Sequence, residues 1–168
     1  MTFREGQEFK VRVRPNSGCN RYASPKLKPA DVCLPLNKTK YCLKVPSFLT
    51  FFLFLHPSDL CFGLRRSFAI NIGHNPENIA LHFNPRFDSN SIVCNHLSGG
   101  SWGEEHREGF LPFSRGEESK FYITLSSDHF YIRLPDGNMI SFPNRLGDVK
   151  YQYFDVSGDA RIVGIKIK

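Results

Sequence analysis

Ile79-Ala80-Leu81-His82-Phe83-Asn84-Pro85-Arg86-Phe87 is the stretch that decides the fold. Its large apolar side chains alternate with polar ones, which is the period-two pattern of a β-strand with one face in a core. His82, Asn84 and Arg86 are therefore expected to share the opposite face. Pro85 has no N–H to donate, so an irregularity or an edge position is expected there.

Short alternating runs of this kind recur along most of the chain. Turn sequences such as Ser98-Gly99-Gly100-Ser101 and Pro135-Asp136-Gly137-Asn138 separate them about every 8–12 residues. A turn at Glu5-Gly6 followed by a strand is predicted within residues 3–14. Further strands are predicted at 67–72, 79–87, 91–95, 102–108, 121–125, 130–134, 139–142, 151–156 and 161–167. No helical pattern separates them, so the residues predict an all-β sandwich or barrel.

Residues 22–66 break this rhythm. They begin Pro-rich and polar, and then run into the apolar stretch 47–55. Deleting them joins the flanking strands through a short turn, so we predict one domain, 1–168, with a 45-residue irregular and poorly ordered insertion. The apolar stretch has nine residues, whereas a helical membrane span needs about 20, so no membrane span is expected.

The sequence of residues 22–66 has features of a translated intron, and we predict this origin for the insertion. Arg21-Tyr22-Ala23 can be encoded by AG-GTATGC, which resembles a 5′ splice site, and the Phe/Leu/Ser/Pro run suits a pyrimidine-rich tract before the AG of Arg65-Arg66. The alternative is a genuine lineage-specific loop with its own function. Abundant spliced transcripts that keep the 45 codons, with introns elsewhere, would decide for the loop.

Charge and cysteine content limit the classes of function. The insertion holds seven basic and two acidic residues, a net charge of +5, so the other 123 residues share only +1 of the total of +6. A nucleic-acid partner is therefore not expected. The five cysteines are odd in number and have no zinc-site spacing, which indicates a reducing compartment and no metal. The polar N-terminus does not resemble a signal peptide.

Seven residues within 26 positions form the candidate binding site. They combine an imidazole, two amides, two guanidiniums, a carboxylate and the single tryptophan: His82, Asn84, Arg86, Asn95, Trp102, Glu105 and Arg107. Converging polar groups can read the direction of a sugar hydroxyl, because the wrong epimer leaves buried groups unpaired at about 1–3 kcal/mol each. A tryptophan offers a rigid face for the apolar side of the ring. Glu105 is expected to stay ionised between Arg86 and Arg107.

The order H-x-N-P-R at 82–86, V-x-N at 93–95 and W-x-x-E-x-R at 102–107 resembles the galectins, the small β-galactoside-binding lectins. The resemblance covers residues 2–15 and 67–168. It implies a two-sheet antiparallel β-sandwich of jelly-roll type, with a shallow sugar groove on the concave face. It also implies a non-enzymatic lectin without cofactor, made in the cytoplasm and exported without a signal peptide to reach glycoproteins and glycolipids.

The resemblance assigns a role to each site residue. His82, Asn84 and Arg86 would bind the axial 4-hydroxyl of galactose, and Arg86 would also reach the ring oxygen. Asn95 and Glu105 would hold the 6-hydroxyl, and Trp102 would stack on the ring. Glu105, Arg107 and Arg86 would bind the 3-hydroxyl of the neighbouring glucose or N-acetylglucosamine, as in lactose or N-acetyllactosamine.

Two departures from the family pattern affect these expectations. The loop after the N-P-R motif is short, and a sugar contact by Asp88 or Asn90 is left open and not assigned. Residues 3–14 align with the second strand of the family, so the first strand is expected to be missing or cut short. A homodimer through paired terminal strands, frequent in the family, is therefore not favoured.

The residues leave two alternatives to a working lectin, a glycosidase and an interaction module. A glycosidase needs a second carboxylate roughly 5–9.5 Å from the first, but Glu104 is expected to face away from Glu105. The other alternative is an interaction module whose sugar site is masked or disabled by the insertion. Lactose turnover would reveal the hydrolase, and measurable lactose affinity separates the lectin from the interaction module.

Overall fold

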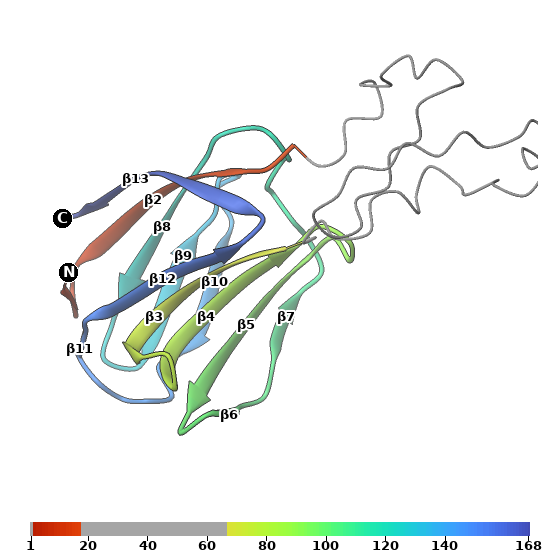
Figure 1. Ribbon diagram of the computed structural model, residues 1–168. Coiled ribbons are helices and arrows are strands. Elements are labelled where there is room, and N and C mark those ends of the chain that lie inside the picture. Colours follow the sequence, from red (N-terminus) through yellow and green to blue (C-terminus); the bar gives the residue numbers. More distant parts are fainter. Residues whose placement is uncertain (1, 18–66) are drawn as a thin grey trace, which may run out of the picture. The chain divides into compact units, whose positions relative to one another are not determined.

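The computed structural model describes residues 2–17 and 67–168, all within one compact unit (Figure 1). Their strands are β1 (Phe3–Arg4), β2 (Glu8–Pro15), β3 (Phe68–Asn75), β4 (Asn78–Arg86), β5 (Ser91–Ser98), β6 (Ser101–Trp102), β7 (His106–Glu108), β8 (Ser119–Leu125), β9 (His129–Arg133), β10 (Met139–Pro143), β11 (Lys150–Tyr151), β12 (Tyr153–Gly158) and β13 (Ala160–Ile167). The predicted insertion 22–66 lies outside the described residues. Within them, no helix is long and apolar enough to cross a membrane.

Two antiparallel sheets lie face to face. One has five strands in the order β10-β9-β8-β2-β13, and the other has six in the order β12-β3-β4-β5-β6, with β7 also paired to β5. Strands β1 and β11 form a small additional ladder. Both large sheets end in strands with a single neighbour, so the fold is an open sandwich and not a closed barrel. The predicted all-β sandwich is confirmed.

The core fills the space between the sheets, and period-two alternation explains which side chains enter it. On β2, Phe9, Val11 and Val13 are at most 1% exposed, while the residues between them face solvent. On β4, Leu81 and Phe83 are likewise buried in this core. Each such side chain contributes about 1.5–3 kcal/mol on burial. Cys94 is also fully buried, and burial raises the pKa of its thiol, as expected for a packing residue.

Pro85 lies inside the sheet and not at its edge. Strand β4 is flanked by β3 and β5, and Pro85 is opposite Ile92 of β5. Toward β3 the backbone pairing stops between Ile70–Phe83 and the isolated bridge Ser67–Arg86. The predicted irregularity is therefore present, and the predicted alternative of an edge position was wrong.

The stretch 102–108 is not one strand, as the sequence suggested, but two short ones. Strand β6 ends at Trp102 and β7 begins at His106. The turn before β6 has Gly99 and Gly100 at φ of 54° and 78°, which matches a two-residue hairpin that needs two positive φ values. The interruption at 103–105 frees Glu105 from the strict alternation of a strand.

Candidate functional site

Strand β4 presents His82, Asn84 and Arg86 on the outer face of the six-stranded sheet, opposite its core-facing residues. Cross-strand pairing on β5 sets Asn95 opposite His82. Strand β7 adds Arg107, which lies opposite Val93. Directly opposite residues point to the same face, so the sheet brings together side chains that are up to 25 positions apart in sequence.

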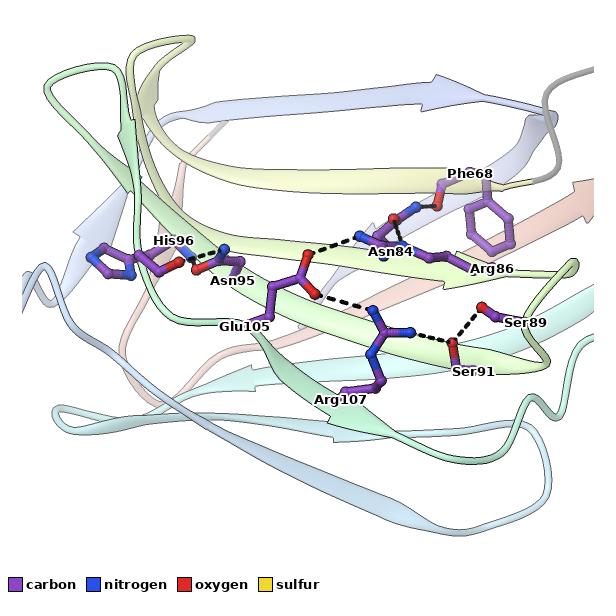
Figure 2. Close-up of polar contacts among 10 residues, drawn as sticks. Phe68, Asn84, Arg86, Ser89, Ser91, Asn95, His96, Glu105 and Arg107 are labelled. Carbon is purple, nitrogen blue, oxygen red and sulfur yellow. Dashed lines mark hydrogen bonds and ion pairs between the residues drawn. The ribbon is translucent and has the colours of Figure 1, made fainter.

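Glu105 links two arginines on this face (Figure 2). Its Oε1 accepts from Arg86 Nη2 at 3.1 Å, and its Oε2 accepts from Arg107 Nη2 at 3.2 Å. The hydrogen bonds from Arg86, and secondarily from Arg107, hold the pKa of Glu105 below its usual range. The carboxylate is thus ionised and committed to two cations, as the sequence predicted, and this is not the environment of a general acid.

Asn84 connects Arg86 to the sheet itself. Its Nδ2 donates to the carbonyl oxygen of Phe68 at 2.6 Å, where Pro85 leaves β4 without a backbone donor (Figure 2). Its Oδ1 accepts from Arg86 Nε at 2.8 Å. Arg86 is therefore held between Asn84 and Glu105, and its planar guanidinium keeps donors on Nη1 and Nη2 for a further acceptor.

His82 belongs to a chain of hydrogen bonds that the sequence did not reveal. Asn71 Nδ2 donates to Asp155 Oδ2 at 3.1 Å, which leaves Asn71 Oδ1 to accept from His82 Nδ1 at 2.6 Å. Nδ1 therefore carries the proton, and Nε2 is an acceptor. Burial and the nearby Arg86 lower the pKa of His82 to about 4, against the opposing effect of Glu105, so the ring is neutral at physiological pH.

A sequence signal for one of these partners was available. Asn71 is the polar residue in the middle of the apolar run 68–72 and is only 8% exposed. A buried amide needs a partner, which could have drawn attention to it. Asp155 had no such signal, because its place beside Asn71 depends on the pairing of β12 with β3.

Trp102 follows the Gly99-Gly100 turn and is 54% exposed. Its ring meets His82 edge-on, with centroids 4.8 Å apart and planes at 64°. The indole thus lies against the imidazole that carries the free Nε2. Such a pairing of a large apolar ring with polar groups at its border suits a ligand with both apolar and hydroxyl surface.

Arg145 and His96 contact the segment that follows Trp102 and restrain it. Arg145 Nη1 donates to the carbonyl oxygen of Glu104 at 2.8 Å and to His96 Nδ1 at 3.2 Å. A side chain at Gly103 would collide with the His96 ring. Arg145 and His96 therefore position the loop that carries Glu105.

Asn95 and Arg107 are less free than the sequence suggested. Asn95 is 4% exposed, and its amide donates to the carbonyl oxygen of Gly103 at 2.9 Å and accepts from the backbone N–H of His96 at 2.8 Å. Arg107 also reaches Ser91 Oγ, at 3.5 Å. Each keeps unused donors, but each also stabilises the face on which it lies.

The remaining titratable residues do not form a second centre here. In residues 2–17 and 67–168, no three His, Cys, Asp or Glu side chains are grouped so as to hold a metal ion. Asp88 Oδ1 accepts from the backbone N–H of Ser89 at 2.8 Å, and Asn90 has φ of 47°, so both residues shape the turn between β4 and β5.

Comparison with known proteins agrees with the fold and the motif. Residues 59–167 match the family described as Galactoside-binding lectin. Galectin-2 of Homo sapiens is 48% identical over 101 residues, which is 60% of this chain and 76% of the relative. Galectin-1 of Mus musculus is 44% identical over 101 residues, 58% of this chain and 75% of the relative.

Solved galectin and congerin structures resemble this chain in fold. The crystal structure of Dario rerio galectin-1-L2 superposes with a TM-score of 0.70 at 34% identity, covering 99% of this chain and 94% of that one. Lactose- and MES-liganded congerin II also reaches 0.70, covering 100% and 95%. Its identity is 24%, so that likeness concerns the fold alone.

Proposed function

This chain belongs to the galactoside-binding lectins, the galectins, which are non-enzymatic, and we propose that it binds β-galactoside glycans on the outer face of its six-stranded sheet. The observation that carries the proposal is the fixed chain of side chains from Asn84 through Arg86 and Glu105 to Arg107, beside His82 and Trp102. Fixed donors and acceptors around an exposed indole suit an uncharged sugar, which has hydroxyl groups in fixed directions and an apolar ring face.

The axial 4-hydroxyl of galactose is the group this arrangement reads. His82 Nε2 accepts the hydroxyl proton, and the free guanidinium donors of Arg86 meet the hydroxyl oxygen. Asn84 contributes by holding Arg86 and through its second amide hydrogen. An equatorial hydroxyl, as in glucose, points away from this convergence and leaves the buried groups unpaired, at about 1–3 kcal/mol each.

The other residues extend the contact to a disaccharide. Trp102 stacks on the apolar face of galactose, while Asn95 and Glu105 hold the 6-hydroxyl. Glu105, Arg107 and Arg86 bind the 3-hydroxyl of the neighbouring glucose or N-acetylglucosamine, so lactose and N-acetyllactosamine are the expected ligands. Because the site is open and small, the expected Kd lies between about 10 μM and 1 mM.

A lactose titration followed by the fluorescence of Trp102 tests the proposal, since the chain has one tryptophan. Saturable change with lactose and none with sucrose is the expected result. No change with either sugar, in protein shown by circular dichroism to be folded, would refute the assignment of the sugar site and leave an interaction module.

The same titration on a variant lacking 22–66 addresses the domain organisation. We propose a single lectin domain interrupted by this insertion, with a translated intron as its origin. Equal affinities in both proteins mean that the domain tolerates the insertion. Binding only after the deletion means that the insertion masks or disables the site, which is the interaction-module alternative.

Galectins are typically cytoplasmic proteins with non-classical secretion. We propose the same route for this chain, with glycoproteins and glycolipids at the cell surface as partners. Strands β12 and β13 each have one neighbour within their sheets and offer edges for self-association. Analytical ultracentrifugation with and without lactose measures whether they are used.

A further inference from the structure

The outer face of the five-stranded sheet carries a dense group of cations, on the side of the sandwich away from the candidate sugar site. Four side chains of β2 point outward, in alternation with the buried Phe9, Val11 and Val13. Glu8 pairs with Arg133 of β9 at 3.0 Å, and the other three are the cations Lys10, Arg12 and Arg14. Residues two apart on a strand are separated by roughly 7 Å, so these three side chains form a straight row about 13 Å long.

The neighbouring strands place more cations directly beside this row. In the ladder between β2 and β13, Arg14 is opposite Arg161 and Lys10 is opposite Lys166. In the ladder between β2 and β8, Arg12 is opposite Lys120. We call these six residues the cationic strip. Like charges directly opposite each other destabilise a sheet, so three such pairs on one strand are a cost to the fold.

A bulge in β13 is what completes the strip. The register with β2 shifts between Ile162 and Gly164, so that Gly164 is opposite Arg12 and Lys166 is opposite Lys10. Without the extra residue, alternation would turn Lys166 toward the core and Ile165 toward solvent. A Cβ at Gly164 would lie 2.8 Å from Arg12 Nη2, so the glycine gives the guanidinium its place over β13.

Few anions neutralise these charges among residues 2–17 and 67–168. Glu118 contacts Arg12 at 3.3 Å and Arg14 at 3.9 Å. In the described part of the chain no ion pair involves Lys10, Lys120, Arg161 or Lys166, and the buried Nε of Arg14 has no hydrogen-bond partner. An open cleft of about 270 Å³ lies among Lys10, Arg12, Gly164, Ile165 and Lys166.

We infer that the cationic strip is a second binding surface, whose ligand is a linear sulfated polysaccharide. A narrow row of fixed cations matches an elongated chain with regularly spaced anionic groups. Guanidiniums such as those of Arg12, Arg14 and Arg161 bind planar or tetrahedral oxyanions through paired N–H donors. The unneutralised charge gives the surface a field that draws in and orients a polyanion.

Other polyanions fit the face less well. Single-stranded nucleic acid is held by stacking on aromatic rings, but Tyr122, the ring beside the strip, is covered by Lys10 and Arg133 at 5.7 and 4.2 Å from its centroid. The sheet has no protruding element to enter a duplex groove. A bilayer would contact the whole face, yet beyond β8 the outward residues include uncharged Tyr131, Met139 and Ser141.

Heparin binding by the full chain tests the inference, measured by calorimetry over a range of salt concentrations. The variant K10Q/K166Q removes one opposed pair of cations from the strip. The matched control R4Q/K150Q removes another opposed, exposed pair, Arg4 and Lys150 of β1 and β11. Both variants keep the basic insertion and have the same net charge. K10R/K166R restores the charge at the tested positions.

The expected result is about a tenfold loss of heparin affinity in K10Q/K166Q, with a shallower dependence on salt. The control should lose less than about twofold, and K10R/K166R should bind like the unchanged chain. Desulfated heparin should bind weakly, and saturating lactose should leave heparin affinity unchanged. This last arm separates the inference from the proposed sugar site, because heparin binding does not depend on lactose binding.

Several outcomes would overturn the inference. Equal losses in K10Q/K166Q and R4Q/K150Q would mean that only net charge matters. Displacement of heparin by lactose would move the ligand to the six-stranded sheet. Tighter binding of duplex DNA or phosphatidylserine vesicles than of heparin, lost in K10Q/K166Q, would show that the occupant is not a polysaccharide.

Discussion

The two sheets share one core, but their outer faces differ in how charged side chains are paired. On the outer face of the six-stranded sheet, Glu105 lies between Arg86 and Arg107, and His82 is bonded through Asn71 to Asp155. On the outer face of the five-stranded sheet, cations oppose cations across the ladders of β2. The same alternation of buried and exposed residues builds both faces.

The difference corresponds to the two kinds of recognition that we propose for these faces. A neutral sugar is discriminated by the direction of hydrogen bonds, so its site needs donors and acceptors that are fixed before the ligand arrives. A polyanion is attracted by a field, so its site needs charge that the protein leaves unneutralised. The first arrangement adds to the stability of the fold, whereas the second subtracts from it.

Acid should destabilise the protein mainly through the six-stranded sheet, and this is the largest effect we expect. The pKa of His82 is lowered from 6.5 to about 4 in the folded chain. As pH falls from about 6.5 to 4, the unfolded chain takes up a proton that the folded chain does not. The free energy of unfolding should therefore drop by about 3 kcal/mol over this range from His82 alone.

Urea unfolding of the unchanged protein, His82→Asn and His74→Asn at pH 7 and pH 4 measures this drop. His82→Asn should remove about 3 kcal/mol of the difference between the two pH values. His74→Asn, which replaces a ring whose side chain is 42% exposed, is the control and should keep it. An unchanged difference in His82→Asn would contradict the assigned ring environment.

Arg86→Gln should separate the two faces by abolishing one activity. It removes the group shared by Asn84 and Glu105 and the donors proposed for the 4-hydroxyl. Lactose affinity should fall at least thirtyfold, about 2 kcal/mol, while heparin affinity stays the same. Arg133→Gln, which removes one cation on the five-stranded sheet, is the charge-matched control; a similar loss of lactose affinity there would point to a general effect of charge.

Asn71→Leu should sharpen the view that the sugar face is preorganised. Without Asn71 Oδ1, the Nδ1 proton of His82 has no acceptor, so part of the imidazole shifts to the other tautomer. Lactose affinity should fall about tenfold, and ¹⁵N NMR of the ring should show the shift. Asp155→Asn keeps an acceptor for Asn71 and should have a smaller effect. A tenfold loss with unchanged ring signals would argue for a packing defect instead.

Lys166→Glu should show the cost of the cationic strip, and it is the smallest effect. Replacing a cation opposite Lys10 by an anion should raise the free energy of unfolding by about 0.5 kcal/mol at low salt, and the gain should vanish at high salt. The urea midpoint measures it. Lys168→Glu makes the same charge change at a residue beyond β13 and should gain less; equal gains would show that only net charge matters.

Much of the fold and of the candidate site could be predicted from the sequence. The alternation in 79–87 and 8–15 fixed the strands and their buried faces, and the ordered motif placed the site residues on one sheet. The irregularity at Pro85 followed from its missing N–H, but its central position did not, because local sequence does not tell which strands become neighbours. The two-part form of 102–108 was missed for the same reason.

Charge was the property least visible in the sequence. A net charge of +1 outside the insertion suggested an unremarkable surface, yet the cations of β2, β8 and β13 lie on one face. A sum over residues contains no information about which of them become neighbours. Likewise, Asp155 could not be linked to His82, because 73 positions separate them and only the pairing of β12, β3 and β4 brings them together.

The sequence by itself determined the all-β class, the alternation of buried and exposed residues, and the members of the proposed sugar site, because these depend on short-range periodicity and on spacing within a few strands. The tertiary structure alone decided the tautomer of His82, the support of the Glu105 loop by Arg145, and the bulge that turns Lys166 outward. These depend on strand register, which is set by packing between distant segments.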